Sequence, residues 1–354
     1  MDKFSEELLN WYHLKRRVLP WREDPAPYHI WLSEIMLQQT RVETVVDYYL
    51  RFIERLPDVR SLAEASEETY VKLWEGLGYY SRVRNLHKAA LVIEEKYAGV
   101  IPGSSKELIG LPGIGPYTSA AIASIAFGEA VPAVDGNLLR IFSRLTLYTE
   151  NIRAPEAFRK AVDYYTRRMP DRVNEQGADN PCGDFNQALM DLGAMICLPN
   201  SEPLCGDCPL AGKCRAHRER PGEESQLPVM PARKEKKTEF LTVFVIRSEE
   251  LTAVRKRPAK GLLAGLYEFP NAKGTLETED AVKWLRDHGV EPIRIRRTQD
   301  AEHVFTHKIW KMRGYEVQAD VLSDEKIPFI MAGKRELKEK YSIPSAFSAY
   351  LEQE

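Results

Sequence analysis

The chain has 354 residues, about twice the usual length of one domain, which predicts two domains. Hydrophobic residues make up 44% of it, and no stretch approaches the about 20 apolar residues of a membrane span. The formal net charge of −2 excludes a protein coated in basic charge but leaves room for a local basic face. The charged, amphipathic N-terminus does not read as a secretory signal, so we expect a cytoplasmic protein with no membrane attachment.

Apolar residues recur at helical spacing through most of the N-terminal part of the chain. The pattern predicts helix from Tyr28 to about Leu56, and shorter helices are expected at 67–75, 82–97, 104–111, 116–127, 137–147 and 155–168. Short breaks rich in Gly, Pro and Asn separate them. This part is therefore predicted to be all-α.

The composition changes after Cys214. The charged stretch that follows contains prolines and a glycine, which is typical of a linker. Runs rich in β-branched residues then predict strands at FLTVFVIRS, LYEFP, IRIRR, HVFTHKIWKM and RGYEVQAD, with helices at TEDAVKWLRDHG and at the end of the chain. We expect a helical domain at 1–220, a linker at 221–237 and an α+β domain at 238–354.

The stretch LPGIGPYTS places Gly113 and Gly115 between two expected helices, the second of which begins at Pro116. Ser104 or Ser105 is a suitable N-cap for the first helix. The glycines allow a tight turn that leaves N–H groups bare at a helix N-terminus, where an anion such as a DNA phosphate can bind. An ordinary turn with a glycine C-cap explains the two glycines equally well.

Two carboxylates stand out from their surroundings. Glu34 lies among Trp31, Ile35 and Leu37, so it is either solvated on an open helix face or held in a pocket with a raised pKa. Glutamate is usually at the surface, and the local string alone favours that alternative. Asp135 directly precedes an expected helix, where an N-cap aspartate is common and the helix N-terminus favours the ionised form.

Four of the five cysteines are clustered, at Cys197, Cys205, Cys208 and Cys214. Clustered thiols in a protein expected to be cytosolic indicate metal rather than disulfides, and thiolates suit zinc or an iron–sulfur cluster. The spacing lacks the second C-x2-C pair of a zinc ribbon. Cys182 stands apart and is expected to be a small buried apolar residue.

Six segments together resemble the MutY family of adenine DNA glycosylases in the endonuclease III superfamily: WLSEIMLQQTRVETV, GLGYYSR, LPGIGPYTSAAI, AVDGNLLR, NPCGDFNQALMDLGAMIC and GLLAGLYEFP. The resemblance covers nearly the whole chain. It implies a helix-hairpin-helix at 104–127, a [4Fe–4S] cluster held by the four cysteines at 197–214, and a Nudix-like C-terminal domain. The first gap between ligands is one residue longer than the C-x6-C of the family, and its loop has no Lys or Arg. That puts in doubt a phosphate contact by this loop.

The same resemblance implies a reaction, the removal of adenine mispaired with 8-oxoguanine or guanine in duplex DNA. Glu34 would protonate the adenine at N7, and Asp135 would stabilise the oxocarbenium ion, following two-carboxylate glycoside chemistry. Tyr117 stands where strand-cutting relatives carry a lysine nucleophile, so we expect base removal without strand cleavage. Tyr117 and Asn137 would line the sugar.

Further residues are expected to contact DNA by resemblance. The adenine must be flipped out of the duplex into a pocket, which would be shaped by Trp21, Arg22 and Gln187. On the opposite side of the base stack we expect Gln39, Leu77 and Tyr79, with the hairpin glycines on a phosphate. The 8-oxoguanine would be read by the loop Phe305, Thr306 and His307, where the family usually has Phe-Ser-His. The local string HVFTH taken alone favours a simpler explanation, one strand with alternating faces.

Three other functions compete with this one. A bifunctional glycosylase/lyase is opposed by Tyr117 in the lysine position, and a noncatalytic DNA-binding Fe–S protein is opposed by the presence of both Glu34 and Asp135. A nucleotide pyrophosphatase would need an R-E-x-x-E-E helix after the GLLAGLYEFP segment, and TEDAVKWLRDHGV has no such cluster. We expect a monomer that binds duplex DNA.

Overall fold

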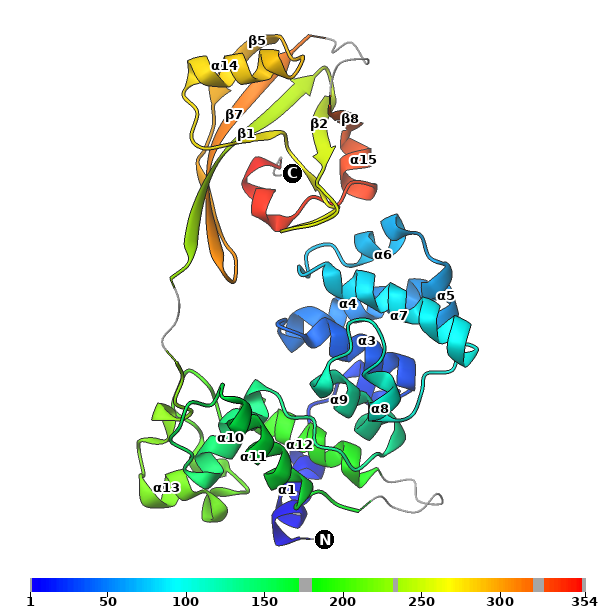
Figure 1. Cartoon of the computed structure of the whole chain (residues 1–354), viewed down its shortest axis with the longest axis vertical. Coiled ribbons are helices and arrows are strands. Elements are labelled where there is room, and N and C mark those ends of the chain that lie inside the picture. Colours follow the sequence, from blue (N-terminus) through cyan, green and yellow to red (C-terminus); the bar gives the residue numbers. More distant parts are fainter. Residues whose placement is uncertain (1, 172–179, 232–234, 321–327, 352–354) are drawn as a thin grey trace. The chain divides into compact units, whose positions relative to one another are not determined.

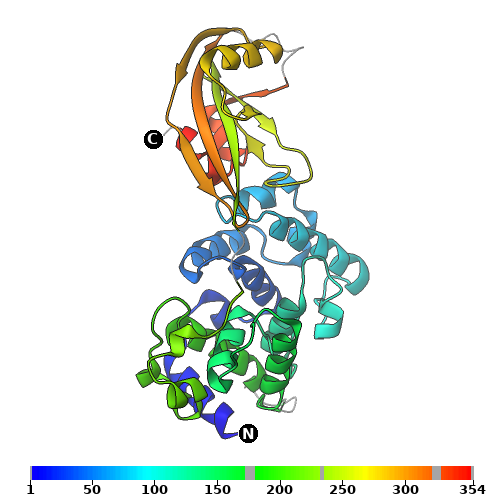
Figure 2. The ribbon, with the colours of Figure 1, turned by 60° about the vertical axis from the view of Figure 1, so that its left-hand side comes forward.

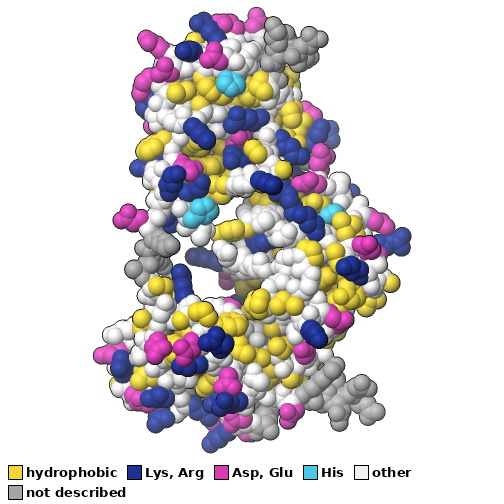
Figure 3. All heavy atoms as spheres, viewed as in Figure 1, with side chains coloured by type: hydrophobic (Ala, Val, Ile, Leu, Met, Phe, Trp, Pro, Cys, Tyr) yellow, Lys and Arg dark blue, Asp and Glu magenta, His cyan; other side chains and the backbone are white. Residues whose placement is uncertain are grey.

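The structure, a computed structural model, describes residues 2–171, 180–231, 235–320 and 328–351 (Figure 1). The chain divides into two compact units. The first comprises Met1–Ala65 and Ser81–Ala232, and the second comprises Ser66–Tyr80 and Arg233–Glu354. In the described ranges, no helix is both long and apolar enough to cross a membrane. On the face shown in Figure 3, basic and acidic side chains intermingle, as the small net charge leads one to expect.

The first unit is helical, as predicted. Its helices include α1 (Lys3–Lys15), α2 (Pro20–Glu23), α3 (Pro27–Leu37), α4 (Val42–Arg55), α5 (Val59–Glu64), α7 (Ser81–Tyr97), α8 (Ser105–Leu108), α9 (Pro116–Phe127), α10 (Gly136–Thr146), α11 (Pro155–Thr166), α12 (Pro181–Met195) and α13 (Arg215–Glu219). Helix α9 packs against α3 and α12, which is possible because its buried surface is largely Ala and Ser. A buried cluster joins α1, α10, α11 and α12.

The continuous helical pattern predicted from Tyr28 to Leu56 is divided in the structure. Helix α3 ends at Leu37 and α4 begins at Val42. Between them Gln39 adopts φ 59°, a left-handed conformation that no helix interior accepts. Hydrophobic periodicity carries no information about the backbone conformation of a single residue. The pattern therefore predicted one uninterrupted helix across Gln39.

The glycine turn at 113–115 has the expected local structure. The Ser104 side chain caps α8 by accepting from the Glu107 N–H at 3.3 Å. Gly113 has φ +79°, and a Cβ there would lie 2.7 Å from the Asn85 Cβ, so backbone and packing both require glycine. Gly115 is the N-cap of α9, and the space where its Cβ would lie is open.

The second unit is built on a sheet flanked by helices (Figures 1 and 2). Among the described residues its strands are β1 (Lys237–Ser248), β2 (Leu251–Lys256), β3 (Tyr267–Glu268), β4 (Asn271–Lys273), β5 (Pro292–Arg297), β6 (Ala301–Val304), β7 (Lys308–Ala319) and β8 (Ile330–Gly333). The path β3-β2-β1-β7-β5 forms the main order, and the long pair β1 and β7 is parallel. The fold is α+β, as predicted.

Alternate residues of β1 face two different cores. Val243 and Val245 face the core that contains the C-terminal segment η4 (Ser345–Tyr350), and Phe244 and Ile246 face the core beneath α14 (Thr278–Asp287). This alternation follows from the two-residue period of a strand. Helix α14 is the one expected at TEDAVKWLRDHG. In place of one helix at the end of the chain, the structure has the short α15 (Lys334–Glu339) followed by the 3-10 segment η4.

The predicted strand HVFTHKIWKM is divided into β6 and β7 by a turn. The Phe305 N–H donates to the Lys308 carbonyl at 2.8 Å, and Thr306 and His307 are exposed at the tip. The explanation of HVFTH as one alternating strand is therefore wrong. A tight hairpin without glycine gives little sequence signal, because β-branched and aromatic residues continue through it.

The second unit also takes in a segment from the helical half of the sequence. Residues 66–80, with α6 (Glu67–Leu73), belong to it. The Ile343 N–H donates to the Glu75 carboxylate at 3.1 Å.

In the first unit, Glu224 and Leu227 of the expected linker are buried, so this part of the linker is packed rather than extended.

Candidate active site

Glu34 lies in the middle of α3 and is only 6% exposed. Of the two alternatives that the sequence left open for this residue, the structure has the buried one. Burial raises the pKa of the Glu34 carboxyl to about 7, a hydrogen bond from the Tyr117 hydroxyl lowers it, the Asp135 charge raises it and the Arg22 charge lowers it. A carboxyl with this pKa carries a proton in a substantial fraction of molecules at neutral pH, so it can act as an acid or as a base.

Asp135 is the N-cap of α10, as the sequence suggested. Its Oδ1 accepts from the backbone N–H groups of Asn137 and Leu138, each at 2.8 Å, and its Oδ2 accepts from the Asn137 side chain at 3.0 Å. Burial nevertheless raises the pKa of Asp135 above its ordinary value, against the opposing effect of these hydrogen bonds. The helix N-terminus thus orients the carboxylate without lowering its pKa below the ordinary value.

Tyr117 completes a group drawn from separate helices. It lies in the first turn of α9, next to the glycine turn, and its hydroxyl points to Glu34 and to the Met190 sulfur at 4.0 Å. One residue on, Thr118 Oγ1 accepts from the Gln38 side chain at 3.2 Å, which ties α9 to the end of α3. The hairpin therefore carries a side chain of the candidate active site as well as its exposed turn.

A chain of hydrogen bonds joins Asp135 to the cysteines. Arg140 on α10 donates to the Asn137 side chain at 3.0 Å, and Asn137 donates to Asp135. The same guanidinium donates to the Cys197 carbonyl at 2.9 Å and to the Gly193 carbonyl at 2.8 Å. Arg140 has no distinctive signal in the sequence, because an arginine on a helix usually marks a solvated face.

The residues expected to shape the adenine pocket have different environments. Trp21 is buried with its ring edge-on to Tyr49, at 5.2 Å between centroids. Gln187 is half-buried on α12. Arg22 contributes to the pKa of Glu34 and is held by Asp191 at 2.8 Å. Asp191 was missed, because α12 also carries Asp184, Asn186 and Gln187, so one more polar side chain on it does not stand out.

Two residues expected to enter the base stack have unusual backbones. Gln39 is exposed with φ 59°, and Tyr79 is 46% exposed with φ 46°. Non-glycine residues with positive φ are uncommon, and such conformations concentrate at functional sites. Leu77 is 6% exposed. In the second unit, the Tyr79 hydroxyl forms a hydrogen bond with the hydroxyl of Thr306 in the turn between β6 and β7.

The four clustered cysteines line one cavity. Apolar residues of α10 and α12 form much of its wall, together with Arg144, His217 and Glu224. Cys182 is buried elsewhere, with its sulfur 3.3 Å from the Pro170 carbonyl, as its expected structural role requires. All five thiols are free of disulfides.

The donor set of this cavity suits a cationic iron–sulfur or metal group. Burial raises the pKa of Cys205 to about 11 and that of Cys208 to about 12, so a bound cation is needed to keep them as thiolates at neutral pH. Arg144 Nη1 lies 3.2 Å from the Cys197 sulfur, and its buried Nη2 has no hydrogen-bond partner in the described residues. An unpaired buried donor on a residue that lines the same cavity as four thiols fits an acceptor-rich sulfur cluster.

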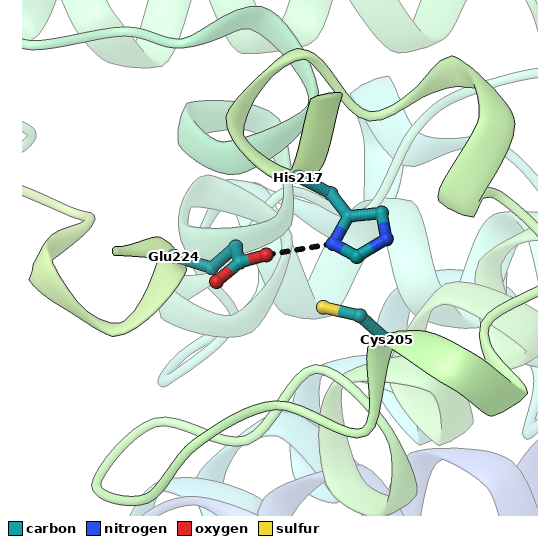
Figure 4. A group of neighbouring side chains, drawn as sticks. All are labelled: Cys205, His217 and Glu224. Atoms are coloured by element: carbon teal, nitrogen blue, oxygen red, sulfur yellow. Dashed lines mark hydrogen bonds and ion pairs between the residues drawn. The ribbon is translucent and has the colours of Figure 1, made fainter. Parts of the chain in front are cut away.

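Two further side chains close the cavity beside Cys205. The His217 Nδ1 is paired with Glu224 at 2.7 Å, and the Cys205 sulfur lies beneath the pair (Figure 4). The donor atoms of the three residues lie within 4.8 Å of one another. The sequence placed both His217 and Glu224 at the start of the linker region and gave them no role.

The loop Phe305, Thr306 and His307 is presented as a hairpin tip. Phe305 is packed edge-on against the buried Trp310, at 4.9 Å between centroids, which anchors the turn from below. The Phe305 carbonyl accepts from the Lys236 ammonium at 2.8 Å. A hydroxyl and an imidazole are thereby left exposed at the tip.

Comparisons with known proteins agree with this geometry. The model for the HhH-GPD superfamily base excision DNA repair proteins matches residues 32–167, and the model for the NUDIX domain matches residues 242–353. The adenine DNA glycosylase of Buchnera aphidicola subsp. Baizongia pistaciae is 33% identical over 310 residues, covering 86% of this chain and 83% of its own. The adenine DNA glycosylase of Rattus norvegicus is 36% identical over 362 residues, covering 86% of this chain and 68% of its own.

Among solved structures, a thermostable thymine-DNA glycosylase is similar to the helical part, with 28% sequence identity and a TM-score of 0.53. It covers 61% of this chain and 95% of its own. The matches to the curated relatives extend over both units, whereas the match to this solved structure covers the helical part. On the strength of these matches, the chain belongs to the adenine DNA glycosylase family and is an adenine-specific DNA N-glycosylase.

Proposed function

We propose that this enzyme removes adenine paired with 8-oxoguanine or guanine in duplex DNA by hydrolysis, and that it leaves the DNA backbone intact. The observation that carries the proposal is the buried Glu34 carboxyl, whose pKa is raised to about 7 beside Tyr117 and Asp135. Adenine is a poor leaving group until a ring nitrogen is protonated. A carboxyl that keeps its proton near neutral pH can supply that proton.

Glu34 donates its proton to N7 of the flipped adenine, and the glycosidic bond then breaks with both electrons leaving on the base. Positive charge develops on the sugar. The Asp135 carboxylate, fixed by two backbone N–H groups and by Asn137, stabilises that charge. Glu34, now ionised, accepts a proton from the water that attacks the sugar. The division of labour is that of two carboxylates in glycoside hydrolysis.

Base removal stops at hydrolysis because Tyr117 offers a hydroxyl and not an amine. A strand-cutting enzyme needs an amine that attacks the sugar and forms a Schiff base. The pKa of the Tyr117 hydroxyl is raised well above its ordinary value by burial and by the neighbouring carboxyls, so it stays protonated and acts as a hydrogen-bond donor. Its role is to orient Glu34.

We further propose that Cys197, Cys205, Cys208 and Cys214 hold a [4Fe–4S] cluster. When bound, such a cluster supplies four Fe–S bonds that tie the segment after α12 to the helical unit. The Arg144 guanidinium and the Arg140 chain to Asp135 support this assignment, since both place positive charge beside the expected sulfurs. Zinc is the alternative occupant, and the iron content of the purified protein separates the two.

The second unit is proposed to recognise the base opposite the adenine. In support, Thr306 presents a hydroxyl at a hairpin tip that is braced by Phe305, and Tyr79 lies beside it in the same unit. 8-Oxoguanine differs from guanine at O8 and N7–H, which a hydroxyl and a backbone group can distinguish. Such a substrate would place the enzyme with the chromosomal DNA, and we expect it to act as a monomer.

The decisive experiment uses labelled duplexes with A opposite 8-oxoguanine, G or T, analysed with and without alkali. We expect base loss on the first two duplexes and strand breaks only after alkali. Glu34→Gln preserves shape but cannot deliver a proton, and it should reduce single-turnover excision by ~10²–10⁴-fold or more with nearly unchanged mismatch binding. Near-normal excision by this variant would remove Glu34 from the mechanism.

A further inference from the structure

A buried aspartate on α12 holds two arginines from the start of the chain. The Asp191 side chain has 0% exposure and pairs with Arg17 at 2.7 Å and with Arg22 at 2.8 Å. Arg22 meets both carboxylate oxygens, at 2.8 and 3.0 Å, and Arg17 adds its backbone N–H at 3.2 Å. A buried carboxylate with so many charge-assisted partners is fixed in one orientation.

The two arginines differ in their freedom to move. The Arg17 side chain is 26% exposed and can reach solvent, whereas the Arg22 side chain is 9% exposed. Arg22 also donates to the Arg17 carbonyl at 3.1 Å, and its guanidinium stacks over the Tyr12 ring at 5.6 Å. If Arg22 lost its carboxylate partner, it would remain a buried charge in search of another.

Arg22 lies on α2, which packs against the helix α3 that carries the proposed acid. The groups that face Glu34 are Tyr117 from α9, Asp135 from the start of α10 and Arg22 from α2, while Arg82 on α7 donates to the carbonyls at the end of α3. Of these, Arg22 is a cation whose charge lowers the pKa of Glu34. Its effect on Glu34 is limited as long as Asp191 neutralises it.

We propose that Asp191 is a positioning residue for base release, which holds the Arg22 guanidinium in a neutralised pair and so prevents an ion pair between Arg22 and Glu34. The proposal rests on the proposed role of Glu34. Glu34 must carry a proton to release adenine, and an unpaired guanidinium at short range favours the ionised carboxylate. Asp191 therefore preserves the acid without touching the substrate.

The test is the pH dependence of single-turnover adenine excision by Asp191→Asn, from pH 5 to pH 9. The asparagine keeps the shape and removes the charge. We expect the kinetic pKa assigned to Glu34 to fall by about one unit, so that excision is about tenfold slower at pH 8 and near wild type at pH 5. Adding Arg22→Met to Asp191→Asn removes the stray cation and should return the pKa to the wild-type value or above it, even if substrate binding weakens.

Arg17→Met is the matched control, since it removes the more exposed partner and leaves the Arg22–Asp191 pair in place. It should shift the kinetic pKa much less than Asp191→Asn. A rate that falls by the same factor at every pH in Asp191→Asn would show a structural role and overturn the proposal. Should that variant not fold, Asp191→Ser takes its place, since it also removes the charge and leaves a smaller polar side chain: a lowered kinetic pKa is expected, and an unchanged one overturns the proposal.

The two proposals can fail separately. If Glu34→Gln retains excision, the assignment of the acid is wrong. If Glu34→Gln is inactive but the kinetic pKa of Asp191→Asn equals that of the wild type, the acid stands and only the role of Asp191 is lost.

Discussion

Glu34 illustrates what a buried carboxyl costs in stability. Its pKa is raised from an ordinary 4.5 to about 7, chiefly by burial. A carboxyl whose pKa is higher in the folded than in the unfolded protein stabilises the fold below the unfolded value, and this contribution is lost as the pH rises through the folded value. The same raised pKa that keeps a proton on Glu34 at neutral pH therefore lowers the stability of the fold at alkaline pH.

We therefore expect Glu34→Gln, which should be inactive, to be more stable than the wild type above neutral pH. The neutral amide avoids the ionisation penalty, so the gain should be about 1 kcal/mol at pH 5.5 and about 3 kcal/mol at pH 8.5. Thermal unfolding followed by circular dichroism at the two pH values measures it. A gain of the same size at both values would mean that packing, not ionisation, distinguishes the two side chains.

Asn137 connects the Asp135 carboxylate to Arg140, which contacts the cysteine segment. Its amide donates to Asp135 and its carbonyl oxygen accepts from Arg140, which in turn holds the Cys197 carbonyl. An aspartate at this position would lose the donor and place a second carboxylate beside the first. The amide is thus the side chain whose donor and acceptor match both neighbours.

At the scale of the element, the turn before α9 contains two glycines that are present for different reasons. Gly113 is required by φ +79° and by its approach to Asn85, whereas Gly115 has an extended backbone and open space. Since packing does not require glycine at position 115, we attribute Gly115 to a ligand that approaches this turn from outside. An open helix N-terminus with no side-chain cap suits a DNA phosphate.

The two glycines make a matched pair of variants. Gly113→Ala should destabilise the helical unit by about 2–3 kcal/mol, since alanine disfavours positive φ and its Cβ meets Asn85. Gly115→Ala should be within about 0.5 kcal/mol of the wild type in stability but should weaken DNA binding, because its Cβ enters the space before the N–H groups. Thermal unfolding and duplex binding at one stated salt concentration test both. Equal losses of stability in the two variants would contradict this reading.

Regular periodicity was enough to predict most helices, and the change in composition after Cys214 was enough to predict a helical part followed by an α+β part. The clustering of four cysteines in the sequence predicted that their thiols would gather in one place. What it could not predict are single residues whose conformation is set by tertiary packing, such as Gln39, which divides α3 from α4. The turn at Thr306 was hidden for the same reason. The partner of Arg22 was missed because a pairing across 169 residues leaves no local pattern.

For the molecule as a whole, the two units separate the proposed chemistry from the proposed recognition. Glu34, Tyr117 and Asp135 all belong to the first unit. The second unit contains Thr306 together with the segment that carries Leu77 and Tyr79, although Tyr79 and Thr306 are 227 residues apart in sequence. Of the residues expected on the opposite side of the base stack, Leu77 and Tyr79 thus lie in the same unit as Thr306, whereas Gln39 lies in the first unit. This grouping is what supports the proposal that the second unit recognises the base opposite the adenine.

This division predicts what the removal of the C-terminal part would do. A protein truncated near Glu235 keeps the proposed acid and the Asp135 carboxylate, so adenine excision should remain detectable. It loses Thr306, and the retained Tyr79 loses its hydrogen bond to Thr306. Its preference for 8-oxoguanine over guanine should therefore fall. In the full-length chain, the combination of Phe305→Ala, Thr306→Val and His307→Ala should erode the same preference more mildly, since hydrogen bonds of about 0.5–1.5 kcal/mol each are lost while other DNA contacts remain.

Single-turnover excision and binding must be compared on A·8-oxoguanine and A·G duplexes at one salt concentration, because phosphate contacts make absolute affinities depend on salt. The quantity that decides is the ratio of the two substrates, not either rate. Truncation also exposes the surface around Glu75 that the Ile343 N–H now meets, so both rates can fall from loss of stability alone. The loop variant in the full chain controls for this, because it leaves that surface covered. If neither protein changes the ratio, the part of the chain after Glu235 does not recognise the lesion, and the discrimination must lie in the residues before it.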